Sequence, residues 1–142
     1  MTRTQIFEHV SKKYSVIPDY PWEADTSAVL RHPQNNKWFA LIMNVKNAVL
    51  GLQNPDEYTE IMNVKLNPIL IEDLLHEEGF LPAYHMNKKY WISVIIDKVL
   101  LTDEAIKDVL EKSWDQVKPK GKNRGKSNPI VSAFSAGVAG GA

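Results

Sequence analysis

The sequence predicts an α+β fold: an antiparallel sheet of five or six strands, with N- and C-terminal helices packed on one face, plus a short connecting helix. Three observations predict it. Apolar side chains recur at helical spacing near both ends of the chain, which is typical of helices that bury one face. Between these ends, short apolar segments alternate with turn-forming residues, as in β-hairpins. Asn67 and Pro68 supply a helix start between two of those segments.

Composition bounds the class of protein. The 142 residues suffice for one domain, predicted over residues 1–117, followed by a tail over residues 118–142. The chain has no cysteine, which excludes disulfides, thiolate metal sites and thiol catalysis. The N-terminus lacks the apolar run of a signal peptide, and no apolar run approaches the ~20 residues that span a bilayer. We therefore expect a cytoplasmic protein without a membrane partner.

The N-terminal part is predicted as a helix, an irregular segment and a hairpin. The helix covers residues 4–14, with an apolar stripe on one side and His9 solvated on the other. Residues 17–25 are irregular because two prolines oppose regular pairing. Strands over residues 28–31 and 37–45 form a hairpin around a turn at residues 33–36. In its second strand, Trp38, Ala40, Ile42 and Asn44 alternate with Phe39, Leu41, Met43 and Val45, so both faces are largely apolar.

Two further strands and a helix are predicted in the middle of the chain. Residues 47–53 can form a third strand, and residues 60–66 form a fourth. In the fourth strand Asn63 and Lys65 lie on the face opposite Val64. The connecting helix begins at Asn67-Pro68 and is stopped by Gly79.

A last hairpin and a final helix complete the domain. The hairpin pairs residues 80–84 with residues 90–96. Thr102 caps the final helix, whose first turn carries Asp103 and Glu104, where the helix dipole favours anions. Its buried stripe consists of Ile106, Val109, Leu110, Trp114 and Val117. Residues 118–127 are rich in Lys, Gly and Asn, and we expect them to be disordered.

The turn of the last hairpin carries more cationic side chains than a turn needs. Asn87 tolerates left-handed backbone geometry, so it can form the turn itself. His85, Lys88 and Lys89 surround it, flanked by aromatic residues. One interpretation is a solvated hairpin tip whose lysines protect a strand edge. The other is a surface for an anionic partner.

Three stretches together resemble the MmcQ/YjbR family in order and spacing. They are Lys37-Trp38-Phe39-Ala40-Leu41-Ile42, then Asn63-Val64-Lys65-Leu66, then Pro82-Ala83-Tyr84-His85-Met86-Asn87-Lys88 with Tyr90-Trp91-Ile92. The resemblance covers about residues 2–117. It implies a frataxin-like (CyaY-like) fold, a double-wing arrangement of hairpins and a bacterial DNA-binding protein. Iron binding by an acidic first helix is not carried over, because that helix offers only Glu8.

From this resemblance and the cationic turns, DNA is the predicted partner. The expected phosphate contacts come from five basic side chains: Lys37, Lys65, His85, Lys88 and Lys89. Asn87 could hydrogen-bond a base or a phosphate. Trp38 and Trp91 could stack on an exposed base or support the hairpins, and core packing is the alternative for both.

Charge distribution keeps other functions open. Residues 1–117 hold all 17 acidic and 12 basic side chains, a formal charge of −5, while residues 118–142 hold five basic side chains and no acid. Because DNA affinity depends largely on Lys and Arg, this acidic domain would have to bind DNA locally or with help from the tail. A non-enzymatic protein- or small-ligand-binding adaptor is the main alternative. An enzyme with an unrecognised site is a third.

Motifs for chemistry are lacking. The sequence contains no phosphate-binding glycine loop, and its four histidines show no metal-ligand spacing. We therefore expect no catalytic residues, no cofactor and no bound metal.

Overall fold

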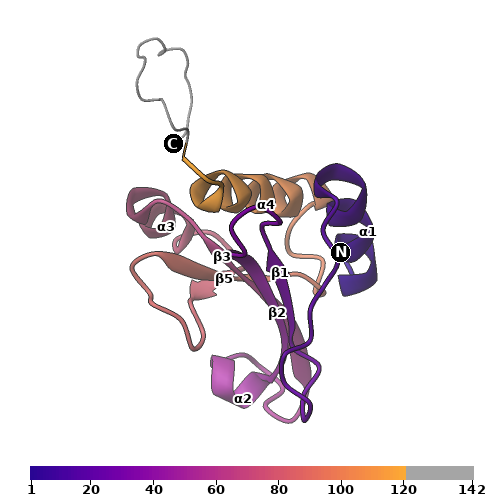
Figure 1. The fold of residues 1–142 in the computed structure, drawn as a ribbon. Helices are drawn as coiled ribbons and strands as arrows, with labels where there is room; N and C mark the ends of the chain where they lie inside the picture. Colours follow the sequence, from indigo (N-terminus) through magenta and orange to yellow (C-terminus); the bar gives the residue numbers. More distant parts are fainter. Residues whose placement is uncertain (121–142) are drawn as a thin grey trace.

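The computed structural model describes residues 1–120 and shows the predicted α+β fold, with five strands in the sheet (Figure 1). The strands are β1 (Ala28–Arg31), β2 (Trp38–Lys46), β3 (Tyr58–Lys65), β4 (Phe80–Pro82) and β5 (Trp91–Ile95). The helices are α1 (Arg3–Tyr14), α2 (Asn47–Leu50), α3 (Pro68–Leu74) and α4 (Asp103–Val117). The sheet order is β1-β2-β3-β5-β4, and every neighbouring pair is antiparallel. Most of the predicted tail, residues 121–142, lies outside the described residues.

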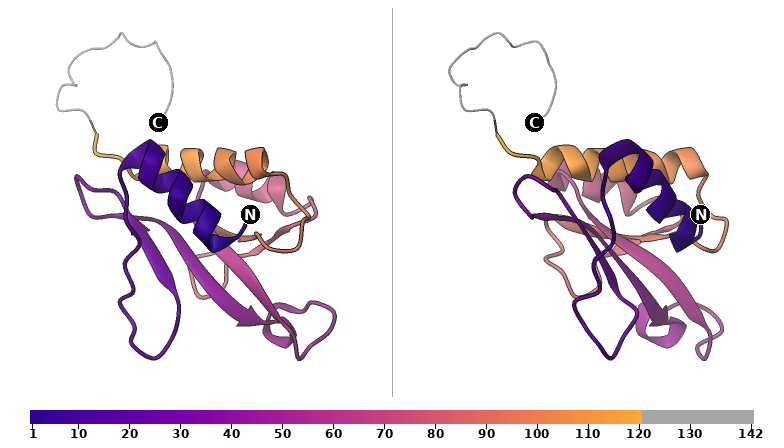
Figure 2. Two further views of the ribbon diagram at one scale, coloured as in Figure 1. Left: turned by 90° about the vertical axis from the view of Figure 1, so that its right-hand side faces the viewer. Right: turned by 45° about the vertical axis from the view of Figure 1, so that its right-hand side comes forward.

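The terminal helices α1 and α4 lie on the same face of the sheet, as predicted (Figure 2). Ile6 and Val10 of α1, together with Ile106 and Leu110 of α4, are buried in a core cluster with the strand residues beneath them. The connecting helix α3 joins β3 to β4 on this same side (Figure 1). Phe7 of α1 and Leu74 of α3 are only partly buried and pack at the margin of the cluster. Helix α4 is therefore the main cover of this face.

Each of the three long helical segments begins with a side-chain cap. Asn67 Oδ1 accepts a hydrogen bond from the backbone N–H of Ile69, and Thr102 Oγ1 accepts one from Ala105, as predicted. Helix α1 begins one residue earlier than predicted. Thr2 caps it in a reciprocal capping box with Gln5.

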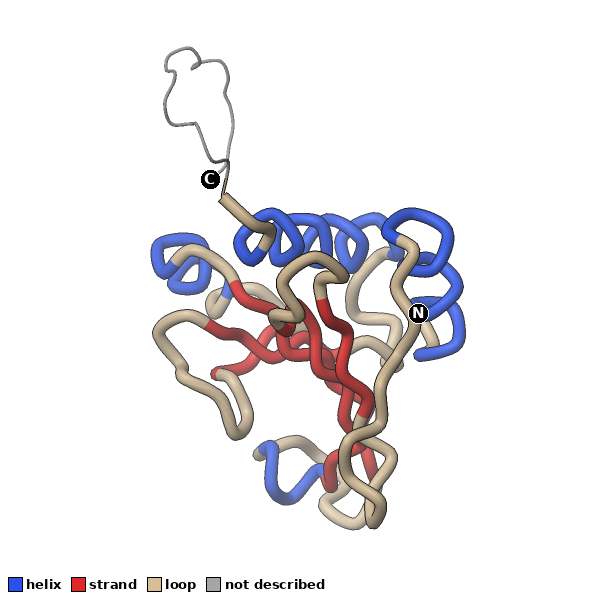
Figure 3. The backbone as a smooth tube through the Cα atoms, in the orientation of Figure 1, coloured by secondary structure: helices blue, strands red, loops and turns tan. Residues whose placement is uncertain are grey.

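The prediction of a strand over residues 47–53 is wrong: this segment forms the one-turn helix α2 and an irregular loop (Figure 3). The buried Asn47 explains the difference. Its side chain donates to the backbone oxygen of Gln53 at 2.8 Å and accepts from Thr59 Oγ1 at 2.6 Å. Gly51 then adopts φ 72°, a left-handed conformation that ends the turn. Side-chain hydrogen bonds of Asn47 thus replace a sheet ladder.

The opposite face of the sheet, called here the second face, has its own apolar cluster of Val29, Leu41, Met43, Val45, Ile61 and Ile95. The predicted alternation of β2 fails at the start of this strand. A register shift against β1 pairs Leu30 with Ala40 and Arg31 with Trp38, which leaves Phe39 as an extra residue. Phe39 therefore packs in the helix-side core with Ala40, while Trp38 packs against the second face with Leu41.

His9 is not solvated as predicted. Its Nε2 is buried without a hydrogen-bond partner, and its ring meets Tyr14 edge to face at 6.2 Å. Burial, reinforced by Lys107 and Lys13, lowers the pKa of His9 below its usual value. Buried His32 stacks on Trp114 at 3.9 Å, and burial, with a smaller effect of Lys118, lowers its pKa as well.

These lowered histidine pKa values predict a pH-dependent stability. Below the unfolded pKa of about 6.5, the unfolded chain binds protons that the folded protein does not. The thermal midpoint should therefore fall as pH decreases from 7.5 to 5.5. Differential scanning calorimetry should show a smaller decrease for His9→Gln, whereas His76→Gln, at an exposed position, should behave as the parent. An unchanged pH dependence in His9→Gln would contradict this assignment.

Within residues 1–120, the helices are all too short or too polar to cross a membrane.

Candidate nucleic-acid interface

The predicted last hairpin contains a longer loop than expected. Its strands shorten to β4 and β5, and residues 83–90, the β4–β5 loop, connect them. Two hydrogen bonds attach this loop to the second face, and a third joins the two strand residues that make them. The N–H of Tyr84 donates to Ser93 Oγ at 2.9 Å, and Asn63 Nδ2 donates to the oxygen of Tyr84 at 2.8 Å. Ser93 Oγ also donates to Asn63 Oδ1 at 2.5 Å. Both Asn63 and Ser93 are fully buried, so a polar pair inside the sheet fixes the loop.

The residue with the left-handed backbone in this turn is not the one predicted. His85, not Asn87, adopts the left-handed conformation, with φ 59°. Asn87 instead accepts hydrogen bonds: its oxygen from the N–H groups of Tyr90 and Trp91, and its Oδ1 from the N–H of Lys89 at 2.8 Å. This Asx-type turn leaves Lys88 and Lys89 exposed. Asn87 therefore shapes the turn, and its side-chain nitrogen has no hydrogen-bond partner among residues 1–120.

The sheet brings four of the predicted site residues together at one corner. Lys65 pairs with Trp91 across β3 and β5, and the N–H of Leu66 donates to the oxygen of Tyr90 at 3.0 Å. This places Lys65 beside the end of the loop that carries Lys88 and Lys89. We call Lys65, Lys88 and Lys89 the lysine cluster. Lys65 and Asn63 lie on the second face, opposite Val64, as predicted.

Lys37 and Trp38 lie at the same end of the sheet, one strand from β3. Trp38 is the first residue of β2, and Lys37 directly precedes it. The antiparallel neighbour β3 finishes at this same end of the sheet. His85 is separated from them. It lines a cavity on the second face with Met43 and Asp25, farther along β2. The structure therefore gathers Lys37 and the lysine cluster at one sheet end and excludes His85 from that group.

Several cations of the domain are neutralised by acidic side chains. Arg3, Arg31 and Lys13 form ion pairs with Glu60, Asp19 and Glu111. By contrast, Lys37 and the three lysines of the cluster form no ion pair within the described part of the chain. Lys37, Lys88 and Lys89 are exposed, and Lys65 is half-buried. These four ammonium groups are available for an anionic partner.

The two tryptophans are both half-buried, but their surroundings differ. Trp38 meets Trp22 edge to face at 5.9 Å, and the guanidinium of Arg31 lies 5.5 Å from its ring. These contacts favour a supporting role for Trp38. Trp91 lies beside Lys65 in the sheet, so it remains the candidate for stacking on a base.

Two cationic residues directly after helix α4 were not predicted as part of the site. Asn35 Nδ2 donates to the oxygen of Val117 at 2.7 Å, and the N–H of Lys65 donates to Ser113 Oγ at 2.8 Å. Helix α4 therefore ends at the sheet end that carries the lysine cluster. Lys118 and Lys120 follow and are exposed. The sequence alone shows that lysines are concentrated after α4. It does not show at which end of the sheet this segment begins.

Residues 1–120 bring together no three His, Cys, Asp or Glu side chains in a position to hold a metal ion.

Several known proteins are similar to this chain in sequence or in structure. The YjbR family model matches residues 11–116. The uncharacterized protein YyaQ of Bacillus subtilis is 42% identical over 119 residues, which cover 83% of this chain and 99% of the relative. A crystal structure of a Pseudomonas syringae protein is 38% identical with a TM-score of 0.75, over 80% of this chain and 96% of that one. Deinococcus radiodurans protein DR2400, at 21% identity and a TM-score of 0.60, covers 80% of this chain and 76% of its own, and shares the fold.

Proposed function

The chain belongs to the YjbR family, and we propose that it is a non-enzymatic DNA-binding protein that uses the lysine-bearing end of its sheet. The lysine cluster carries this proposal. Lys65, Lys88 and Lys89 lie at one corner of the sheet and form no ion pair within residues 1–120. DNA phosphates supply a dense row of negative charge that unpaired ammonium groups can neutralise.

The two hairpin loops would act as two wings on the DNA backbone. The loop between β1 and β2 carries Lys37, and the β4–β5 loop carries Lys88 and Lys89. Both loops are at the same sheet end, so one DNA segment can contact both. Asn87 Nδ2 supplies a donor for a phosphate or a base, while Oδ1 is engaged in the turn.

The acidic domain limits how tightly DNA can bind. Residues 1–117 have a formal charge of −5, so contacts away from the lysine cluster would repel the DNA backbone. Residues 118–142 add five basic side chains, and they leave the domain from the same sheet end. The tail would therefore strengthen binding by the domain without specifying a sequence.

Truncation after Val117 tests this arrangement. We expect a thermal midpoint close to that of the full chain, because the composition of the removed segment predicts few apolar contacts. Affinity for random duplex and single-stranded DNA, measured by fluorescence anisotropy, should fall because five cationic side chains are lost. Residual, salt-sensitive binding should persist on residues 1–117. A complete loss of binding by this correctly folded domain would show that the lysine cluster is not a DNA surface.

A further inference from the structure

A cavity of about 290 Å³ lies on the second face, near the end of β2. Four separate parts of the chain line it. They are Asp25, Thr26 and Ser27 before β1, residues 43–46 of β2, Val49 of α2, and Tyr84 with His85 of the β4–β5 loop. The lining combines one acidic and one basic side chain, Asp25 and Lys46, with two aromatic rings and the apolar Met43 and Val45. The DNA contacts proposed above do not use it.

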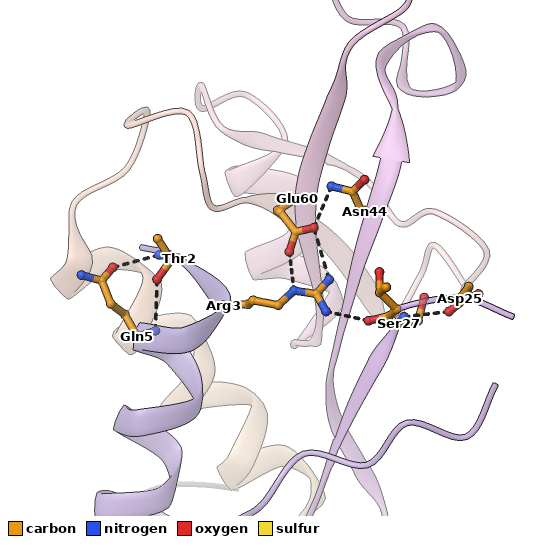
Figure 4. A network of polar contacts seen from close by, with 8 residues as sticks. Thr2, Arg3, Gln5, Asp25, Ser27, Asn44 and Glu60 are labelled. Carbon is orange, nitrogen blue, oxygen red and sulfur yellow. Dashed lines mark hydrogen bonds and ion pairs between the residues drawn. The ribbon is translucent and has the colours of Figure 1, made fainter. Parts of the chain in front are cut away.

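One wall of the cavity is fixed by an ion-pair network (Figure 4). Arg3 of α1 pairs with Glu60, its Nε donating to Oε1 at 2.7 Å, and its Nη1 donates to the backbone oxygen of Thr26 at 2.6 Å. Asn44 Nδ2 donates to Glu60 Oε2 at 2.7 Å. Arg3 and Glu60 are both largely buried, with side-chain exposures of 22% and 18%. The irregular segment beside β1 is thereby held at a set position against β2.

The opposite wall is fixed by the buried Asn63–Ser93 pair, which holds the backbone of Tyr84 on both sides. The ring of Tyr84 lies 4.0 Å from that of His85, centre to centre. His85 is exposed and has a left-handed backbone, an unfavourable conformation for a residue with a side chain. Backbone strain of this kind is often retained where it positions a side chain for binding.

We propose that this cavity receives one unpaired base of a single DNA strand whose phosphates lie on Lys88 and Lys89. The inference rests on the proposed DNA-binding function and adds a base site to it. The imidazole of His85 would stack on the base, as aromatic side chains do in proteins that bind single strands. Tyr84 supports the imidazole from behind.

Asp25 determines which bases fit. Its Oδ1 accepts a hydrogen bond from the N–H of Ser27 at 2.7 Å, and its Oδ2 accepts none within the described chain. A carboxylate only accepts hydrogen bonds, so Oδ2 selects an exocyclic amino group such as that of cytosine. Thymine has no amino group, and its one donor on that edge, the N3–H, lies between two carbonyl oxygens that this carboxylate would repel.

The distance between the cavity and the lysines suits one strand. His85 and Lys88 are three residues apart, so their Cα atoms are separated by at most ~11 Å. Successive nucleotides of one strand rise by about 3.4 Å or more, so two or three nucleotides span that distance. A strand can therefore place a base beside His85 while a neighbouring phosphate contacts Lys88.

The test compares fluorescein-labelled dodecamers of deoxycytidine and of thymidine, binding to the full chain at pH 7.5 and low salt. The parent should bind the cytosine strand about fivefold or more tightly, the range of one base-edge contact. Asp25→Asn removes the charge and replaces one acceptor by a donor that suits thymine, so the preference should vanish or reverse. Asp97→Asn removes an exposed charge outside the cavity and should keep the parent's preference.

His85→Gly tests stacking independently of Asp25. Glycine suits the left-handed backbone, so the variant should fold at least as stably as the parent. It should bind both dodecamers about fivefold or more weakly and keep the preference for cytosine, because stacking distinguishes bases little. Affinities equal to those of the parent would overturn the stacking contact.

Two failures are distinguishable. Equal parental affinity for both dodecamers, or an unchanged preference in Asp25→Asn, would overturn the base site. The DNA-binding proposal would stand if Lys88→Ala with Lys89→Ala still weakened both interactions. If neither dodecamer nor duplex DNA bound the parent, the base site and the DNA-binding proposal would fail together.

Discussion

Replacing Leu110 with alanine is expected to lower the free energy of unfolding by about 2–5 kcal/mol. Leu110 is fully buried at the centre of α4, where this helix packs on β2 and β3. The substitution removes apolar contacts and leaves a cavity that a helix held at several points cannot readily close. Urea unfolding followed by circular dichroism measures the loss through the transition midpoint and slope.

Ile69→Ala provides a matched control. Ile69 is an apolar residue of α3, but 73% of its surface is exposed, so its replacement should change stability by less than about 0.5 kcal/mol. If Leu110→Ala were as mild as the control, α4 would not be the main cover of the sheet, and the placement of the core would be wrong.

Most of the fold is predictable because helical spacing and helix caps depend on residues that are close together in the sequence. Helical spacing predicts α1 and α4, and the Asn67 and Thr102 caps predict where α3 and α4 begin. The failures arise where a long-range contact decides. The extra residue Phe39 depends on pairing with β1, and the alternation of β2 alone cannot reveal it. Helix α2 depends on hydrogen bonds from Asn47 to residues up to twelve positions away.

The candidate site was only partly predictable for the same reason. Spacing along β3 places Lys65 on the second face, and composition identifies Lys88 and Lys89. Their assembly into one corner depends on the pairing of Lys65 with Trp91, which a single sequence does not specify. The sequence shows Asn63 and Ser93 as polar residues within apolar strands. Only the folded chain shows that both side chains hydrogen-bond the backbone of Tyr84.

Replacing Lys88 and Lys89 together by alanine should have the largest effect on DNA affinity. If each ammonium group neutralises one phosphate, each contact releases condensed counterion and contributes about −0.9 to the slope of log K against log salt. The double variant should bind duplex DNA of any sequence about tenfold or more weakly at low salt. Stability should change little, because exposed lysines in a turn usually contribute less than about 0.5 kcal/mol.

Lys12→Ala with Lys107→Ala is the control for this variant. It removes the same formal charge from the two helices α1 and α4, away from the β4–β5 loop. General loss of positive charge would weaken DNA binding equally in both double variants. A local lysine contact predicts a much larger loss in the loop variant.

The salt dependence of DNA binding tests whether Lys88 and Lys89 contact DNA phosphates. Affinity of the parent and of both double variants for one duplex should be measured by anisotropy over a series of salt concentrations. We expect a slope shallower by about 2 for Lys88→Ala with Lys89→Ala, and a nearly parental slope for the helix control. A loop variant with the parent's affinity and the parent's slope would contradict this expectation. The β4–β5 loop would then not be the DNA surface, and an adaptor that binds a protein or a small ligand would become the better interpretation.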